Sequence, residues 1–274
     1  MRILGIVAGR GDLPRAVAES AKARGVFVVA LNGLCGPWVD GFAHEWVSLG
    51  EPGRAMKALS RAKAEEVLLA GKVARPKFSD LALDAKGMML MPKVLAAARE
   101  GDDALLRLLV RLFEDEGFRA VGVAEAAPGL VVQSGPLGRY RPNGGHERDI
   151  ARAFAIVRAL GALDVGQAAV VCEGLALAVE AAEGTDAMLA RVAQMKDSLR
   201  GTPEKRRGVL AKALKPTQDA RTDMPVVGVE TLNRVGESGL AGIALETGKC
   251  LIVEKPKVAE IADRLGLFVM GIKP

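Results

Sequence analysis

Short runs of apolar residues alternate with amphipathic segments along the first half of the chain. These runs are rich in Val, Leu and Ala, which is typical of strands that are buried on both faces of a parallel sheet. The predicted strands are residues 2–8, 26–31, 44–49, 66–70 and 118–125, and the predicted helices are residues 14–23, 53–64 and 104–116. The alternation of strands and helices predicts an α/β domain.

The second half resumes this alternation after a stretch of loop-forming residues. Residues 132–147 are rich in Gly, Pro, Asn and Arg, so we place a domain link at 133–147. The predicted helices beyond it are about 148–160, 186–196, 230–237 and 256–265, and the predicted strands are 167–172, 174–179, 208–214, 225–229, 241–245, 250–253 and 268–271. The sequence therefore predicts two α/β domains, residues 1–132 and 148–274.

Composition agrees with layers of small aliphatic side chains and favours an anionic partner. Half of the 274 residues are apolar but only 4% are aromatic, and the formal net charge is +5. A mild basic excess favours nucleotide phosphates or an acidic membrane surface. Nucleic acid is not expected as a partner, because the chain offers few aromatic rings for stacking and no dense Lys/Arg block.

Cysteine and histidine usage argues against a transition-metal or redox site. Cys35, Cys172 and Cys250 are far apart and match no zinc or redox spacing, so we expect reduced cysteines in a cytosolic protein. His44 and His146 lie in no HExxH or HxH pattern. We recognise no signal peptide, and every apolar run is too short or too interrupted to cross a bilayer.

A glycine-containing loop joins the first predicted strand to the first helix. Gly9 and Gly11 precede Leu13, which opens the helix, and this order is typical of a site for a nucleotide or phosphate. The loop departs from a dinucleotide fingerprint because the third glycine is missing and Asn32, not an acid, follows the second strand. A simple tight turn is an equally good interpretation. Asp12 is a candidate cap for the helix.

Two further segments place polar residues near the ends of elements. Gly71 and Lys72 follow a predicted strand, where α/β sheets bind ligands, although a basic loop is the alternative. Asp102 and Asp103 open the helix that follows Gly101. We expect one of them to cap that helix and the other to face the cleft.

The densest group of candidate catalytic residues lies between two prolines, Pro216 and Pro225. Asp219, Arg221 and Asp223 are spaced so that they share one face of an extended chain, and the two acids also share a face in a helical turn. Lys215 precedes them. Paired carboxylates suit Mg²⁺ and cations suit phosphate, while a charged edge strand or a solvated turn is the alternative.

Glu180 and Glu183 form a second acidic pair, at the end of an apolar strand. Glu183 is easily explained as an acid near a helix start, where Thr185 or Asp186 is the candidate cap. Glu180 comes directly after the strand and is harder to explain as a solvated residue. We take both as candidate metal ligands together with Asp219 and Asp223.

Five motifs occur together in one order and cover most of the chain. They are Gly9-x-Gly11-x-Leu13-Pro14, Gly71-Lys72-Val73-x-Arg75-Pro76, Gly101-Asp102-Asp103, Ala178-Val179-Glu180-Ala181-x-Glu183-Gly184-Thr185-Asp186 and Lys215-Pro216-x-Gln218-Asp219-x-Arg221-x-Asp223-x-Pro225. This set resembles the bacterial UDP-2,3-diacylglucosamine pyrophosphatases of the LpxI type. The last two motifs are the specific ones.

The resemblance implies an enzyme of lipid A biosynthesis with a Rossmann-like N-terminal domain and a distinct α/β C-terminal domain. It implies hydrolysis of UDP-2,3-diacylglucosamine to 2,3-diacylglucosamine 1-phosphate and UMP, with Mg²⁺ or Mn²⁺ as cofactor. It further implies a homodimer that binds peripherally to the inner face of the cytoplasmic membrane.

Candidate roles combine the motifs with their chemistry. The predicted catalytic residues are Lys215, Asp219, Arg221 and Asp223; the predicted metal ligands are Glu180, Glu183, Asp219 and Asp223; and the predicted nucleotide-binding residues are Gly9, Gly11, Leu13, Gly71, Lys72, Asp102 and Asp103. Residues 88–95 are a candidate lining for an acyl-chain groove between the domains, and a core helix is the alternative.

Competing interpretations of the same residues remain open. One is a nicotinamide-dependent oxidoreductase, which the strand–glycine loop–helix unit favours and the missing ribose-binding acid opposes. Another is a non-catalytic module that binds a nucleotide sugar, which leaves the Asp219/Asp223 pair without a purpose. A membrane-surface scaffold would use the basic charge alone.

Overall fold

The computed structural model describes residues 2–74, 76–216, 221 and 223–273, and at Asp102 it describes the backbone alone. The chain divides into two compact units. The first contains the described residues of Met1–Gly129 together with Arg221 and Asp223. The second contains those of Leu130–Gln218 and Met224–Pro274.

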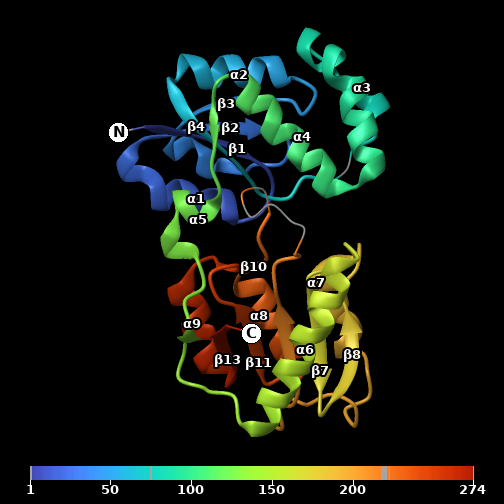
Figure 1. Ribbon diagram of the computed structural model, residues 1–274. Coiled ribbons are helices and arrows are strands. Elements are labelled where there is room, and N and C mark those ends of the chain that lie inside the picture. The colour runs from blue at the N-terminus through green and yellow to red at the C-terminus, as the bar shows by residue number, and fades with distance from the viewer. Residues whose placement is uncertain (1, 75, 217–220, 222, 274) are drawn as a thin grey trace. The chain divides into compact units, whose positions relative to one another are not determined.

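A parallel sheet forms the centre of the first unit, with strand order β3-β2-β1-β4-β5 (Figure 1). Its strands are β1 (Ile3–Ala8), β2 (Val26–Leu31), β3 (Ala43–Val47), β4 (Ala64–Ala70) and β5 (Arg119–Ala120). This is the order of a doubly wound nucleotide-binding sheet. The prediction of an α/β fold is confirmed, whereas the predicted strand 118–125 is wrong beyond Ala120, because the chain turns there into a short helix.

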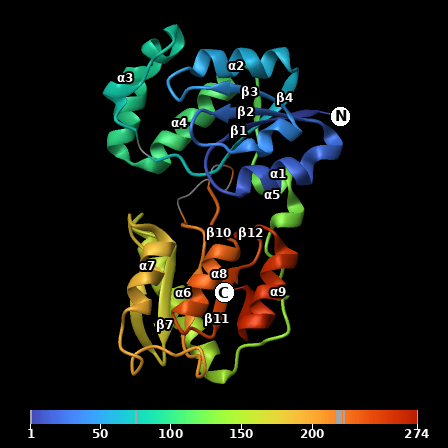
Figure 2. The ribbon, with the colours of Figure 1, turned by 180° about the vertical axis from the view of Figure 1, so that it is seen from behind.

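Helices cover both faces of this sheet. They are α1 (Leu13–Ala21), α2 (Pro52–Arg61), α3 (Ala85–Glu100), α4 (Asp102–Asp115) and α5 (Val123–Ala126), with 3₁₀ turns at Lys22–Arg24, Pro37–Gly41, Phe78–Asp80 and Pro128–Leu130. Helices α1 and α5 lie on one face and α2 and α4 on the other (Figures 1 and 2). Helix α3 packs on α4 and on α2.

The second unit is built on a mixed sheet with strand order β6-β13-β11-β9-β7-β8. Its strands are β6 (Gly135–Pro136), β7 (Ala168–Cys172), β8 (Leu175–Val179), β9 (Val209–Lys212), β11 (Gly242–Glu246) and β13 (Phe268–Ile272). Strands β9, β11 and β13 are parallel, and β7 is antiparallel to both β8 and β9. A small parallel pair, β10 (Val226–Val227) and β12 (Leu251–Ile252), lies outside this sheet.

Helices α6 (Gly144–Ala162), α7 (Gly184–Ala193), α8 (Val229–Glu237) and α9 (Lys255–Leu265) complete the second unit. Strand β7 is buried on both faces: Ala168 and Val170 pack in the core beneath α7, α8 and α9, whereas Ala169 and Val171 pack beneath α6. Helix α6 begins four residues earlier than expected, because Asn143 and His146 form a capping box at its start.

Burial keeps two of the three cysteines protonated. All three are free thiols, and burial raises the pKa of Cys172 to about 11 and that of Cys250 to about 12. These two thiols are therefore protonated at neutral pH and unreactive. No helix in the part of the chain that the structure describes is both long enough and apolar enough to span a bilayer.

Candidate functional site

The glycine loop of the first unit packs against the segment that follows β4. The amide of Gly9 donates to the carbonyl of Ala70 at 2.8 Å, and the backbones of Arg10 and Lys72 exchange two hydrogen bonds of 2.9 Å. A Cβ at Gly9 would lie 2.8 Å from the carbonyl oxygen of Lys72, so this position excludes larger residues. The structure thus brings together the predicted Gly9 and Gly71–Lys72 segments at the carboxyl edge of the sheet.

Gly11 lies in this loop for a different reason. Its φ is 96°, a conformation that L side chains rarely adopt, and a Cβ there would meet no atom within 4 Å. Leu13 then opens α1, as predicted, but the expected cap is wrong: Asp12 occupies the N-cap position without a side-chain hydrogen bond to the helix. The first amides of α1 are therefore not capped by Asp12, and such amides suit an anion.

The acids at the start of α4 do not cap it. Gly101, with φ of 131°, holds the N-cap position, and Asp102 and Asp103 lie within the first turn. The expectation that one of them is the cap is therefore wrong. Acids in a first turn are favourable because the amino end of a helix is partially positive. Asp103 is half-buried, and the side chain of Asp102 lies outside the described atoms.

The segment between Pro216 and Pro225 is described in part, and Asp219 lies outside the described residues. Arg221 and Asp223 belong to the first unit, whereas Lys215 belongs to the second. Arg221 Nη1 lies 3.1 Å from Glu114 Oε1 on α4, and Lys215 Nζ lies 2.6 Å from Asp164 Oδ1. Asp223 is half-buried. That Asp219, Arg221 and Asp223 share one face stays a prediction.

Three buried charged residues lie at the carboxyl edge of the sheet in the second unit. Strand β8 runs parallel to β9, because both are antiparallel to β7. Glu180 follows β8 directly, Lys212 ends β9 and Glu246 ends β11. All three are buried, with 7%, 4% and 8% of their surface exposed. Parallel strands present ligand sites at this edge.

A hydroxyl connects two of these charges. Lys212 Nζ lies 2.7 Å from Thr185 Oγ1, and Thr185 Oγ1 lies 2.8 Å from Glu180 Oε1. A lysine ammonium can only donate, so Thr185 accepts from Lys212 and must donate its single proton to Glu180. The order Lys212–Thr185–Glu180 therefore fixes Glu180 Oε1 as an acceptor. The second oxygen, Oε2, is buried and has no hydrogen-bond partner among the described residues.

Glu183 has a different environment from Glu180. It occupies the N-cap position of α7, without a side-chain cap hydrogen bond, and its carboxylate lies 2.5 Å from Arg191 Nη2. Hydrogen bonds from its own backbone amide and from Arg191 lower the pKa of Glu183. The expected cap from Thr185 or Asp186 is wrong, because Glu183 holds the N-cap position and both of these residues lie in the first turn of α7.

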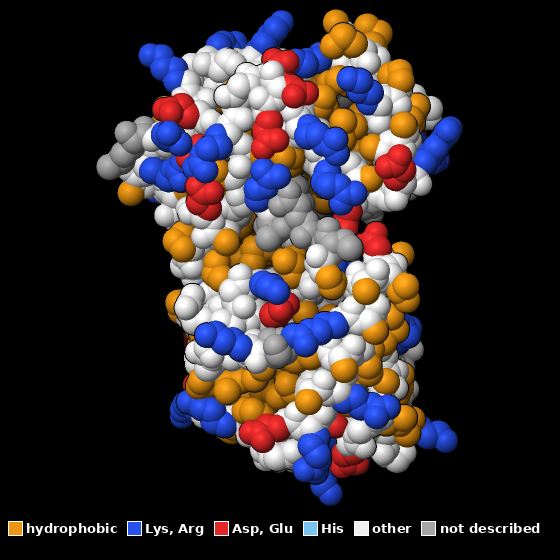
Figure 3. Space-filling view, in the orientation of Figure 1, with side chains coloured by type: hydrophobic (Ala, Val, Ile, Leu, Met, Phe, Trp, Pro, Cys, Tyr) orange, Lys and Arg blue, Asp and Glu red, His pale blue; other side chains and the backbone are white. Residues whose placement is uncertain are grey.

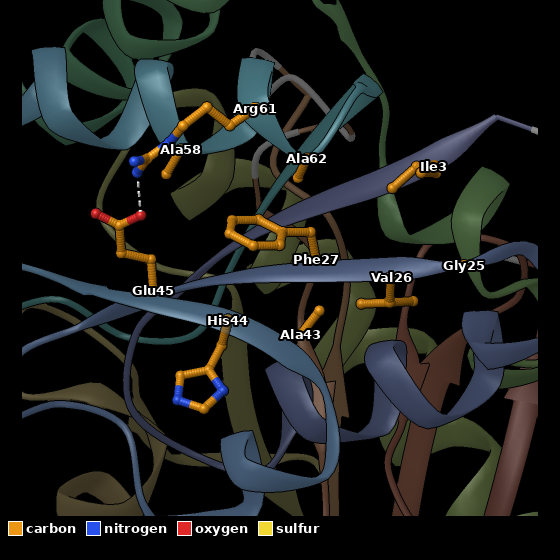
Figure 4. Close-up of a pocket in the computed structure, with 10 residues that line it drawn as sticks. All are labelled: Ile3, Gly25, Val26, Phe27, Ala43, His44, Glu45, Ala58, Arg61 and Ala62. Atoms are coloured by element: carbon orange, nitrogen blue, oxygen red, sulfur yellow. Dashed lines mark hydrogen bonds and ion pairs between the residues drawn. The ribbon is translucent and has the colours of Figure 1, made fainter.

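Two cavities of the first unit lie at the amino edge of its sheet, opposite the glycine loop. One of about 430 Å³ is lined by the first residues of β1, β2 and β3, which are Ile3, Val26 and Ala43 (Figure 4). Glu45 in its wall already binds Arg61 at 2.5 Å. A second cavity, near Arg2 and Arg119, also opens at the amino ends of strands. Neither contains a predicted site residue, and α/β sheets place ligands at the opposite edge.

Comparison with known proteins identifies both halves of the chain. Residues 3–130 match the LpxI N-terminal domain, and residues 133–270 match the LpxI C-terminal domain. The chain belongs to the LpxI family. It is 46% identical, over 276 aligned residues, to the UDP-2,3-diacylglucosamine pyrophosphatase LpxI of Caulobacter vibrioides (strain ATCC 19089 / CIP 103742 / CB 15), and the match covers 100% of this chain and 99% of that protein. The family that the five motifs indicated is confirmed.

The described residues of this LpxI-family chain offer one ligand of the kind that a magnesium site needs. Among the residues that the structure describes, no group of three or more His, Cys, Asp or Glu side chains is placed to hold a metal ion. The buried, unpartnered Oε2 of Glu180 is nevertheless a hard oxygen donor of the kind that Mg²⁺ prefers. Mg²⁺ is commonly held by one or two carboxylates together with substrate phosphates, so Glu180 would supply one of the carboxylate ligands.

Proposed function

We propose that this protein hydrolyses the pyrophosphate bond of UDP-2,3-diacylglucosamine, giving 2,3-diacylglucosamine 1-phosphate and UMP for lipid A biosynthesis. The observation that carries this proposal is the 46% identity, over essentially the full length of both chains, to the pyrophosphatase named above. The motifs support it, because they place acids and cations in both units.

The first unit is proposed to bind the uridine nucleotide at the carboxyl edge of its sheet. Gly9 and Gly71 allow the loop and the β4 segment to pack closely, and the open space beside Gly11 leaves its backbone accessible to an anion. The exposed Lys72 adds a positive charge beside this loop. Leu13, Asp102 and Asp103 complete the proposed nucleotide-binding set.

The proposed hydrolytic residues are Lys215, Asp219, Arg221 and Asp223. Carboxylates orient the attacking water and accept its proton, and the two cations offset charge on the phosphates. The proposed metal ligands are Glu180, Glu183, Asp219 and Asp223. A bound Mg²⁺ or Mn²⁺ would supply charge stabilisation to the pyrophosphate oxygens. We also propose a homodimer that associates peripherally with the inner face of the cytoplasmic membrane.

The first competing function finds little support in the structure. In a nicotinamide-dependent oxidoreductase, an acid at the end of β2 would bind the ribose, but Asn32 stands there and its amide donates to Ser48 Oγ at 3.1 Å. The second, a non-catalytic module for nucleotide sugars, predicts binding without turnover.

Product analysis separates these functions. The purified chain is incubated with UDP-2,3-diacylglucosamine and Mg²⁺, and the products are identified by mass spectrometry. Release of UMP supports the proposal. EDTA should abolish that release and added Mg²⁺ or Mn²⁺ should restore it, because hard oxygen ligands bind these ions reversibly. Uridine-nucleotide binding without UMP would favour the binding module, and full turnover in exhaustively chelated protein would overturn the metal requirement.

A further inference from the structure

Exposed apolar side chains of the first unit gather at one side of its sheet. Within the described part of that unit, the large apolar residues that are more than a third exposed are Leu49, Val73, Met88, Met89 and Leu95. Leu49 follows the carboxyl end of β3, Val73 follows that of β4, and the other three lie on α3. Scattered apolar residues on a surface need no explanation, but a bias toward one side does.

Helix α3 is fixed at this same carboxyl edge. The amide of Asp84, its N-cap, donates to the carbonyl of Gly50, which follows β3, at 3.1 Å. Asp84 also accepts from the amides of Gly87 and Arg54, at 2.6 and 3.0 Å. The start of α3 is therefore anchored to the segment after β3, beside the edge that carries the proposed nucleotide loop.

The exposure of α3 is unusual for its sequence. From Gly87 to Ala98 the helix is apolar almost all round, with Lys93 as its one charge. Helices of this composition are normally buried on all sides. Here, among its sixteen residues, only Gly87, Leu90 and Ala98 are buried, while Met88 and Met89 are 61% and 68% exposed. The expected core-helix alternative for residues 88–95 is therefore wrong, and a large apolar face lies uncovered (Figure 3).

Basic residues flank this face. Lys93 lies one turn from Met89, and Arg99 lies one turn from Leu95; both are exposed. The other lysine of α3, Lys86, is paired with Glu116. Long basic side chains beside an exposed apolar stripe suit the boundary of an anionic bilayer, because their stems lie on hydrocarbon while their charges reach the headgroups.

We propose that the Met88–Met89–Leu95 face of α3 docks on the anionic surface of a phospholipid bilayer, with Lys93 and Arg99 at the level of the headgroups. This inference rests on the proposed function, because a diacylated substrate resides in a bilayer. It names the side of the first unit that meets the membrane: the side carrying the nucleotide loop. A lipid substrate would then reach the protein without its acyl chains crossing water.

Vesicle flotation of the full chain tests this surface without any substrate. Vesicles of phosphatidylcholine alone are compared with vesicles that contain phosphatidylglycerol. The test variant is Met88→Gln/Met89→Gln, which keeps side-chain length and helix propensity. The matched control is Leu175→Gln, which changes another large apolar side chain, 51% exposed, at the start of β8 in the second unit. Thermal unfolding of each variant checks that it is folded.

The unmodified chain and Leu175→Gln should float with the anionic vesicles, and the double Gln variant should bind at least about tenfold more weakly. Lys93→Glu/Arg99→Glu should lose the preference for anionic over neutral vesicles. Equal binding by the double Gln variant, or no binding by the unmodified chain, overturns the proposal. Suppose that the unmodified chain binds no vesicles and that light scattering shows a dimer which the folded double Gln variant loses. The face would then be assigned to contact with a second copy of the chain.

Different results would contradict the docking surface and the proposed function. If the protein binds vesicles through α3 but releases no UMP, the docking surface is supported and the proposed reaction is refuted. If it releases UMP but does not bind vesicles, the reaction is supported and the docking surface is refuted.

Discussion

Replacing Thr185 by valine tests the connection between the two buried charges of the second unit. Valine has nearly the same shape as threonine but lacks the hydroxyl that accepts from Lys212 at 2.7 Å and donates to Glu180 at 2.8 Å. The change therefore removes both hydrogen bonds with little change in packing. Lys212 and Glu180, which are 4% and 7% exposed, would be left without these partners.

The expected loss of unfolding free energy follows from these contacts. Each hydrogen bond involves a charged group, for which the net contribution is about 1.5–3 kcal/mol. Breaking both, with two charges left buried, should lower the free energy of unfolding by about 3–5 kcal/mol. This is a large part of the roughly 5–15 kcal/mol that stabilises an ordinary domain. Thr185→Ser keeps the hydroxyl and should lose only about 1 kcal/mol or less.

Urea unfolding followed by far-ultraviolet circular dichroism measures this loss. Both tryptophans, Trp38 and Trp46, lie in the first unit, so their fluorescence reports that unit separately and serves as an internal control. The dichroism transition should move to lower urea in Thr185→Val and stay near its original position in Thr185→Ser. Equal stability of the two variants, within about 1 kcal/mol, would show that the hydroxyl does not connect these charges.

Three further predictions concern the site and the fold. Asp223→Ala should lower turnover by roughly a hundredfold or more, the scale of a lost general base, with binding and melting temperature maintained; near-normal turnover would remove Asp223 from the catalytic set. Gly11→Val should weaken UDP-sugar binding by roughly tenfold, whereas Gly117→Val, at a comparable positive φ of 89° and equally open, should bind normally; equal affinities would mean that the Gly11 loop is only a turn. Burial lowers the pKa of His146, and the nearby Asp149 partly opposes this effect. The unfolded state therefore takes up a proton first, so the free energy of unfolding should fall as pH drops from about 7.5 to 5.5. His146→Gln keeps the capping box and should flatten this pH dependence, whereas an unchanged slope would show that His146 is not its source.

The elements that the sequence predicts well are those with strong hydrophobic periodicity. The buried runs that became β1, β2 and β4 are continuous and apolar, so their assignment needs only local information. The predicted strand 118–125 is longer than β5 because Val121 and Val123 continue an apolar run, although a helix starts at Val123. The cap predictions fail for two reasons. Asp12 stands at the N-cap position but its side chain makes no hydrogen bond to the helix, whereas Asp102 and Asp103 lie in the first turn, where an acid is also favourable.

The charged network of the second unit shows what local patterns cannot supply. The sequence identifies Glu180 as an acid after an apolar strand, but its connection to Lys212 through Thr185 depends on the pairing of β7 with β8 and β9. The sequence carries one signal for Lys212, which is a lysine placed directly after the apolar residues 209–211. The structure shows that this whole strand is buried. The exposure of α3 was equally inaccessible, because an apolar helix predicts burial without naming what covers it.

The products formed from UDP-2,3-diacylglucosamine test the central claim most directly. The account predicts that the purified chain, with Mg²⁺, converts this substrate into UMP and 2,3-diacylglucosamine 1-phosphate in equal amounts, because the bond between the two phosphorus atoms is the one broken. Asp223→Ala, folded to the same extent, should form both products far more slowly. Release of UDP with free 2,3-diacylglucosamine would contradict the account, since it would mean cleavage at the sugar, and so would intact substrate recovered after prolonged incubation with the folded protein and Mg²⁺.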